Sequence, residues 1–201
     1  KRLSNYLKKT KLKYPEYFCG PVPAFGDSKA RLLIVGLAPG LHGANATARP
    51  FTGDASGEFL FKALHRFGFS SNAESLPGDK LELFDCRITN AVKCLPPQNK
   101  PTTTETKTCT KYFLHSELNG LSKGSVILAL GSIAHNAVLR AFDKTLSNYH
   151  FGHNTLHNLE NGYYLLDSYH CSRYNTQTKR LTEAMFYEVF EKVKILLANP
   201  I

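Results

Sequence analysis

Two kinds of hydrophobic pattern alternate along the chain: short continuous apolar runs, and apolar residues repeated at helical spacing. Short apolar runs at 32–35, 84–92, 125–130 and 163–168 are typical of buried strands. Apolar residues recur at helical spacing in 58–69, 104–118, 132–142 and 181–197, and a basic helix is expected at 1–13. Strands that alternate with helices favour a parallel sheet covered on both faces. The pattern predicts an α/β fold, a three-layer αβα sandwich around a central four-stranded, mostly parallel sheet.

Local signals suggest several element boundaries. Thr104 is a candidate N-cap for the helix at 104–118, and a turn at 160–162 precedes the fourth strand. Pro200 is expected to end the last helix. Because no linker or repeat interrupts the pattern, we expect a single domain over 1–201, with 1–20 as a basic N-terminal segment.

The polar residues gather in four loops that follow the predicted strands, at 36–54, 90–100, 131–133 and 169–178. The carboxyl ends of parallel strands meet at one edge of a sheet, and ligands of open α/β sheets bind there. These loops are therefore expected to form one composite active site.

The first of these loops is rich in glycine, with Gly36, Gly40 and Gly43. Glycine lets the backbone approach a ligand closely. The same loop carries an amide, an aromatic ring and a carboxylate, namely Asn45, Phe51 and Asp54. These three groups suit the recognition of a flat polar ring, although a plain strand–turn–helix with a solvated loop is the alternative.

Two other predicted strands end in groups that can contact the same ligand. Asn90 lies near the end of the second strand, and His170 follows the fourth. An amide can pair with the edge of a base, and a histidine at a strand end can point into the crevice. The alternatives are an Asn that caps a turn and a His satisfied by backbone groups.

Charge and cysteine content indicate the kind of partner and the cellular compartment. The chain has 25 Lys and Arg against 16 Asp and Glu, a net charge of +9, which indicates a polyanionic partner. Part of the surplus lies in the first 13 residues, where a solvated basic helix is the alternative. No apolar run is long enough to span a membrane, and no signal-peptide pattern is visible, so a cytoplasmic protein is expected. The cysteines number five, which favours free thiols over disulfides.

Three segments together resemble the uracil-DNA glycosylase superfamily, and most closely its family 5, the type B enzymes. They are GLAPGLHGANATARPFTGD at 36–54, ITNAVKCLPPQNKPT at 88–102 and DSYHCSRYNTQTKRLTEAM at 167–185. The segment LALGSIAHNAVLRA at 128–141 supports the match. The resemblance implies an enzyme that flips uracil out of DNA and hydrolyses its N-glycosidic bond, leaving an abasic site. We also expect the enzyme to be a monomer.

The resemblance also implies roles for individual residues. Phe51 would stack on the base, Asn90 would bind its Watson–Crick edge, and His170 would stabilise the leaving anion. Asp54 would position water or stabilise the cationic sugar. Further base contacts would come from Asn45 and from the turn formed by Gly36, Leu37, Ala38, Pro39 and Gly40. The DNA minor groove would be entered by the loop Cys171, Ser172, Arg173, Tyr174 and Asn175.

This sequence departs from the superfamily pattern in two places. The turn 36–40 carries no ionisable residue, which is the family 5 form, shifts the catalytic role onto Asp54 and implies tolerance of bases such as hypoxanthine. Cys171 stands where Pro is usual, so the loop is expected to be looser and the activity weaker.

The resemblance further implies a [4Fe–4S] cluster, which needs four ligands. Cys94 and Cys109 match two of them. The other two either lie upstream of Lys1 or the cluster has been lost. Two further classes stay open: a degenerate member that binds damaged DNA without cutting it, and a nucleotide-binding α/β enzyme. The latter lacks the P-loop Lys-Ser/Thr and the dinucleotide spacing.

Overall fold

The computed structural model describes residues 1–159 and 162–199. The expected turn at 160–162 falls partly, and the expected stop at Pro200 wholly, outside these residues. Within them no helix is long and apolar enough to cross a bilayer.

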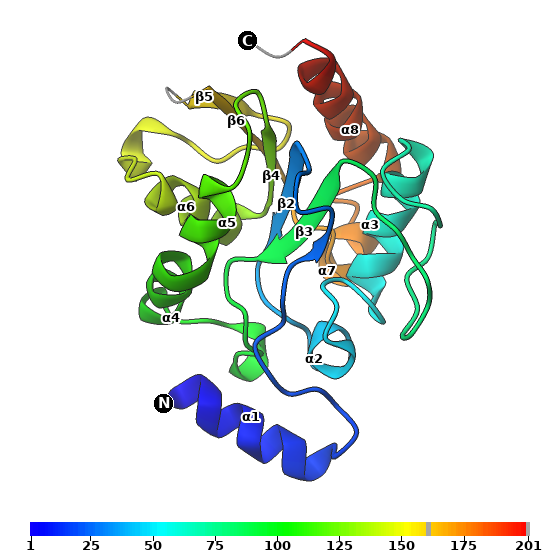
Figure 1. Ribbon diagram of the computed structural model, residues 1–201, viewed down its shortest axis with the longest axis vertical. Helices are drawn as coiled ribbons and strands as arrows, with labels where there is room; N and C mark the ends of the chain where they lie inside the picture. The colour runs from blue at the N-terminus through cyan, green and yellow to red at the C-terminus, as the bar shows by residue number, and fades with distance from the viewer. Residues whose placement is uncertain (160–161, 200–201) are drawn as a thin grey trace.

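A mixed sheet of six strands forms the centre of the molecule, in the order β1-β3-β2-β4-β6-β5 (Figure 1). The four inner strands are parallel: β3 (Cys86–Asn90), β2 (Leu32–Gly36), β4 (Val126–Leu130) and β6 (Tyr163–Ser168). These are the four strands expected from the sequence. The edges are β1 (Phe25–Gly26) and β5 (Leu156–Leu159), both antiparallel to their neighbours. Neither edge strand carries a long apolar run, so hydrophobic pattern alone did not indicate them.

Both faces of the sheet are buried, as a parallel sheet requires. Along β2, Leu32 and Ile34 pack into one hydrophobic core while Leu33 and Val35 pack into the other. Helices α3 (Ala55–Arg66) and α8 (Glu183–Ala198) cover the first face (Figure 1). Helix α6 (Ser132–Ala141), with residues of the segment before β4, covers the second. The result is the predicted three-layer αβα arrangement.

The helix predicted at 104–118 is divided into three pieces. Helix α4 (Thr103–Cys109) is followed by a π-helical turn, η2 (Thr110–Leu114), and by α5 (His115–Asn119). Its N-cap is Thr102, not Thr104, because Thr102 and Glu105 form a reciprocal capping box. The remaining elements are α1 (Arg2–Lys13), α2 (Ala44–Thr47), η1 (Pro97–Asn99), η3 (Leu146–Asn148) and α7 (Arg173–Gln177).

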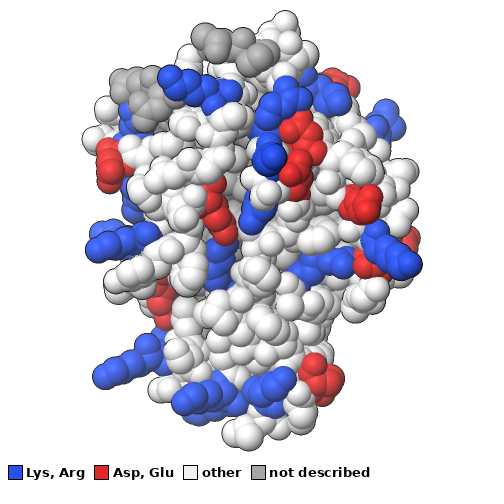
Figure 2. Space-filling view, in the orientation of Figure 1, with Lys and Arg blue, Asp and Glu red and all other residues white. Residues whose placement is uncertain are grey.

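The strand order places a crevice at the end of β2. From β2 the chain continues to β3 on one side and then crosses to β4 on the other, so the direction of winding reverses at β2. Ligands of such sheets bind at this switch point, beyond the carboxyl ends of the strands. The loops after β2 and β3 occupy that end, together with α2 and η1 (Figure 1). Basic side chains also gather there, over α1 at the lower end of the view in Figure 2.

Candidate active site

A cavity of about 50 Å³ lies at the carboxyl ends of β2, β3 and β6. It is lined by Ala38, Gly40, Ala44, Phe51, Asp54, Ser56, Asn90, Asn99 and His170. A second hollow of about 260 Å³ adjoins it, because Asn99 and His170 line both. Loops separated by more than a hundred residues thus bring the predicted aromatic ring, amide, carboxylate and imidazole together.

Asn90 and Phe51 meet at Gly36. Gly36 pairs with Asn90 across the parallel β2–β3 ladder. A Cβ atom at position 36 would lie 2.5 Å from Asn90 Oδ1 and 2.7 Å from the Phe51 ring. Asn90 is only 4% exposed, yet in the part of the chain that the structure describes its side-chain amide has no protein partner. An amide that lines the cavity and has no protein partner is suited to bind a ligand.

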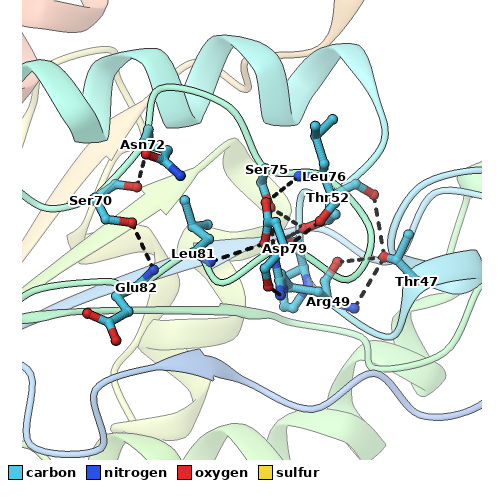
Figure 3. Close-up of polar contacts among 12 residues, drawn as sticks. Thr47, Arg49, Thr52, Ser70, Asn72, Ser75, Leu76, Asp79, Leu81 and Glu82 are labelled. Atoms are coloured by element: carbon cyan, nitrogen blue, oxygen red, sulfur yellow. Dashed lines mark hydrogen bonds and ion pairs between the residues drawn. The ribbon is translucent and has the colours of Figure 1, made fainter.

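Phe51 has a left-handed backbone, with φ of 56°. This conformation is unfavourable for a bulky residue and persists only where its surroundings hold it. A polar network on the flanking residues provides that support (Figure 3). The Thr52 hydroxyl lies 2.7 Å from the Ser75 hydroxyl, and Thr47 Oγ1 lies within donor distance of the carbonyl oxygens of Arg49, at 3.3 Å, and Thr52, at 3.5 Å.

Arg49 and Asp79 form the centre of this network (Figure 3). Burial raises the pKa of Asp79, but hydrogen bonds from Arg49 and from the Leu76 and Leu81 amides outweigh it and lower the pKa overall. The Arg49 guanidinium also lies 4.6 Å from the centre of the Phe25 ring. The segment 70–82 therefore anchors the loop that carries Phe51, a relationship invisible in the local sequence.

Asp54 has two roles in the geometry. Its Oδ1 accepts a hydrogen bond of 2.9 Å from the Gly57 amide and so caps helix α3. Its Oδ2 faces the glycine-rich loop, since a Cβ at Gly43 would lie 2.3 Å from it and one at Gly40 3.2 Å. The glycines therefore leave room for a carboxylate at the cavity wall.

His170 follows β6 and lies beside Phe51, with ring centres 6.1 Å apart and planes 26° from parallel. Burial lowers the pKa of His170 to about 4, so the imidazole is neutral at pH 7. Its Nδ1 is buried without a partner in the described chain. A neutral ring of this kind can donate one hydrogen bond to a ligand.

The loop after His170 divides into a buried and an exposed part. Cys171 is 0% exposed, packs in the core and donates its thiol to the Ser56 carbonyl oxygen at 3.4 Å. It therefore cannot enter a DNA groove, which corrects the expectation for this residue. Asn175 donates to the His170 carbonyl oxygen at 2.8 Å, and Ser172 caps α7. These contacts stabilise the loop at the place where Pro is missing.

Arg173 and Tyr174 are the members of this loop that project to solvent, and Tyr174 is 71% exposed. They stand next to the hollow that Ser172 and His170 line. A cation and an aromatic ring at this position are available to contact a ligand that occupies the hollow.

Not every predicted residue reaches the cavity. The Asn45 amide points toward the Cys19 thiol and the Leu41 carbonyl oxygen. Leu37 lines the adjoining hollow, and Pro39 is buried and lines neither space. Sequence reasoning missed the lining residues Ala44, Ser56 and Asn99. Asn99 had a signal in the sequence, since it lies between prolines in PPQNKP, and in the structure it adopts a positive φ of 55°.

Two groups of metal-ligating side chains lie outside the cavity. Burial raises the pKa of the Cys94 and Cys109 thiols, and Cys109 adds to the rise at Cys94 because the two lie near one another. His135, His157 and Asp167 form the other group. In this group Asp167 accepts from His135 at 2.8 Å and from His157 at 3.0 Å, so its ligand atoms already bind one another.

A profile of the uracil DNA glycosylase superfamily matches residues 23–194. The chain belongs to this superfamily. It is 51% identical to the type-5 uracil-DNA glycosylase of Thermus thermophilus over 90% of this chain and 82% of that protein. The identity to the type-5 enzyme of Mycobacterium leprae is 43%, over 90% and 80% of the two chains. A type-4 enzyme of Pyrobaculum aerophilum is 36% identical over 62% of this chain and 56% of its own length.

The superfamily fold is also found by structure. The crystal structure of wild-type Pedobacter heparinus SMUG2 matches with a TM-score of 0.51 and 15% identity, covering 97% of this chain and 85% of that one. At this identity the match supports the fold alone. The higher similarity to type-5 than to type-4 sequences confirms the resemblance to family 5.

Proposed function

We propose that this protein is a uracil-DNA glycosylase of the type-5 kind, which removes uracil from DNA and leaves an abasic site. One observation carries the proposal: an unpaired amide, an aromatic ring, a neutral imidazole and a carboxylate line one cavity at the sheet's switch point. The type-5 relatives bear the same activity in their names. The surplus of basic residues suits a DNA substrate.

Asn90 and Phe51 recognise the flipped base. An amide offers a donor and an acceptor side by side, which matches the N3–H and O4 edge of uracil. Phe51 offers a buried aromatic face beside that amide, so the ring can stack while its edge is read. Gly36 leaves the space between them open.

His170 and Asp54 act on the bond. When the C1′–N1 bond breaks, its electron pair passes to the base, and the sugar becomes an oxocarbenium-like cation. The neutral imidazole of His170 donates a hydrogen bond to the developing uracil anion. The Asp54 carboxylate stabilises the cationic sugar and orients the water that attacks C1′. The attacking water loses a proton as its oxygen bonds to C1′.

Ser172, Arg173, Tyr174 and Asn175 form the DNA-facing loop, with the two exposed side chains as the wedge. The two others hold the loop in place through the α7 cap and the His170 carbonyl oxygen. We also propose that the enzyme acts as a monomer.

The residues present do not complete a [4Fe–4S] cluster. A cubane needs four ligands, and among the described residues no His, Cys, Asp or Glu group of three includes Cys94 or Cys109. We therefore assign these two thiols as half of such a site at most and derive no step of the reaction through it. Iron and acid-labile sulfide analysis of the purified protein tests this assignment.

A base-release assay tests the activity. Labelled oligonucleotides of about 30 nucleotides carry one deoxyuridine, single-stranded or opposite G or A, and alkali reveals abasic sites. A parallel substrate carries deoxyinosine, and one with thymine is the matched control. We expect cleavage at uracil but not at thymine, and cleavage at hypoxanthine if the apolar turn 36–40 widens base tolerance. DNA binding without release of any base would instead support the degenerate binder.

A further inference from the structure

Helix α1 carries a dense positive charge that the proposed reaction does not use. Residues 1–13 contain six Lys and Arg and no Asp or Glu, and the first acidic residue is Glu16. The blue atoms at the lower end of Figure 2 lie where α1 lies in Figure 1. The position of this charge relative to the cavity decides what it can bind.

The amino end of α1 is held against the segment that follows η1, on one side of the cavity opening. Arg2 binds both carboxylate oxygens of Glu105, at 2.8 and 2.7 Å, and donates to the Lys100 carbonyl oxygen at 3.0 Å. Lys100 directly follows Asn99, which lines the cavity and the adjoining hollow. The bidentate geometry fixes the start of the helix against the loop that ends η1.

The segment after the carboxyl end of α1 is held against the glycine-rich loop and α2, on the other side of the cavity opening. The rings of Tyr14 and Tyr17 stack at 4.7 Å, and the Tyr17 hydroxyl lies 2.8 Å from His42 Nδ1. His42 belongs to the glycine-rich loop that faces Asp54. Just beyond, the Phe18 amide donates to the Ala46 carbonyl oxygen of α2 at 3.1 Å. The helix therefore bridges the two sides of the cavity opening from outside, as Figure 1 shows beneath η1 and α2.

The solvent-facing side of α1 carries exposed lysines that have no acidic partner in the described structure. Leu7 and Thr10 are buried and form the inner face. Lys8 and Lys9 are exposed, and within the described structure neither forms an ion pair with an acidic side chain. A helix of this length extends about 18 Å, which spans several phosphates of a DNA strand.

We propose that α1 is a second DNA-contacting element, in which Lys8 and Lys9 bind phosphates of the DNA that flanks the flipped nucleotide. The contacts at the two ends of α1 hold these cations at a set distance from the base cavity. This inference rests on the proposed function only in taking DNA as the partner. It adds a contact surface distinct from the loop at Ser172–Asn175.

The test uses an undamaged duplex of about 30 base pairs, whose binding is governed by phosphate contacts and involves no cleavage. The double variant Lys8→Gln and Lys9→Gln is compared with the native chain by titration at several salt concentrations. We expect the dissociation constant to rise about tenfold at low salt. The slope of log K against log salt should become shallower by about 1.8, because each phosphate contact contributes about 0.9.

The matched control is Lys29→Gln with Lys123→Gln, which removes the same charge. These exposed lysines precede β2 and β4, at the end of the sheet opposite the cavity. We expect the control to bind as the native chain does. An unchanged slope in the α1 variant, or an equal loss in the control, would overturn the inference. Failure to release uracil would instead refute the proposed function, because this binding test does not depend on base release.

Discussion

Gly36 and Asn90 are register partners in the β2–β3 ladder, and the Asn90 side-chain oxygen lies where a Cβ of residue 36 would be, 2.5 Å away. Gly36→Ala should therefore displace Asn90 and Phe51 and lower the rate of uracil release by at least about tenfold. Gly120→Ala is the control, since a Cβ there would meet its nearest atoms at 3.6 Å. Equal rates for the two variants would show that the cavity tolerates a methyl group at position 36.

Asn90→Ala should reduce the rate of uracil release by about a hundredfold or more, because it removes the amide that the cavity leaves unpaired. Asn90→Asp has nearly the same shape but no amide donor. We expect it to release uracil slowly as well, and single-turnover kinetics measure both variants. Native rates in Asn90→Asp would mean that hydrogen-bond donation by the amide is unimportant.

The two roles of Asp54 can be separated by substitution. Asp54→Ala loses the cap of α3 and should lower the free energy of unfolding by about 1 kcal/mol. It should also lower the rate of uracil release. Asp54→Asn keeps a good capping residue but loses the charge. We expect native stability and a rate reduced by at least about a hundredfold, as judged by thermal unfolding and base release. A fully active Asp54→Asn would remove the carboxylate from the mechanism.

Acid should destabilise the protein partly through His170. Its pKa is about 4 in the folded chain because of burial, and about 6.5 in an unfolded one. Between these values the unfolded chain binds a proton that the folded chain does not, so stability falls as the pH drops through this window. Above pH 7 the residue contributes no pH dependence.

Denaturant unfolding at pH 7 and about pH 5 measures this effect. The native chain should lose more stability on acidification than His170→Gln, which has no ionisable ring. Equal losses in both proteins would mean that His170 titrates as an ordinary exposed histidine.

Arg49 should matter for both stability and catalysis, although it does not line the cavity. Arg49→Ala leaves the partly buried Asp79 without its cation and should cost about 2 kcal/mol. It should also slow uracil release, because the network of Figure 3 holds the left-handed Phe51. Lys62→Ala is the control, since its pair with Glu183 is exposed and solvent-screened and should leave the stability nearly unchanged. Similar behaviour of the two variants would argue against this support.

The sequence predicted the parallel core and the region of the site for clear reasons. Strands buried on both faces need nearly continuous apolar runs, so 32–35, 125–130 and 163–168 were visible in the pattern. Parallel strands end at the same edge, so strand direction was enough to expect that the loops carrying Asn90, Asp54 and His170 lie together. The short edge strands β1 and β5 and the π-helical turn had no such pattern, since they depend on their neighbours.

Only the tertiary structure decided how individual side chains lie. Cys171 and Asn45 follow the same motifs as true cavity residues, yet one is in the core and the other faces Cys19. The support of Phe51 by Arg49 and Asp79 joins segments that no local rule connects. Sequence alone thus determined the class of fold and the chemistry at the strand ends, because these follow from hydrophobic period and strand direction. Which way each side chain points was decided by packing, because it depends on contacts between residues far apart in the chain.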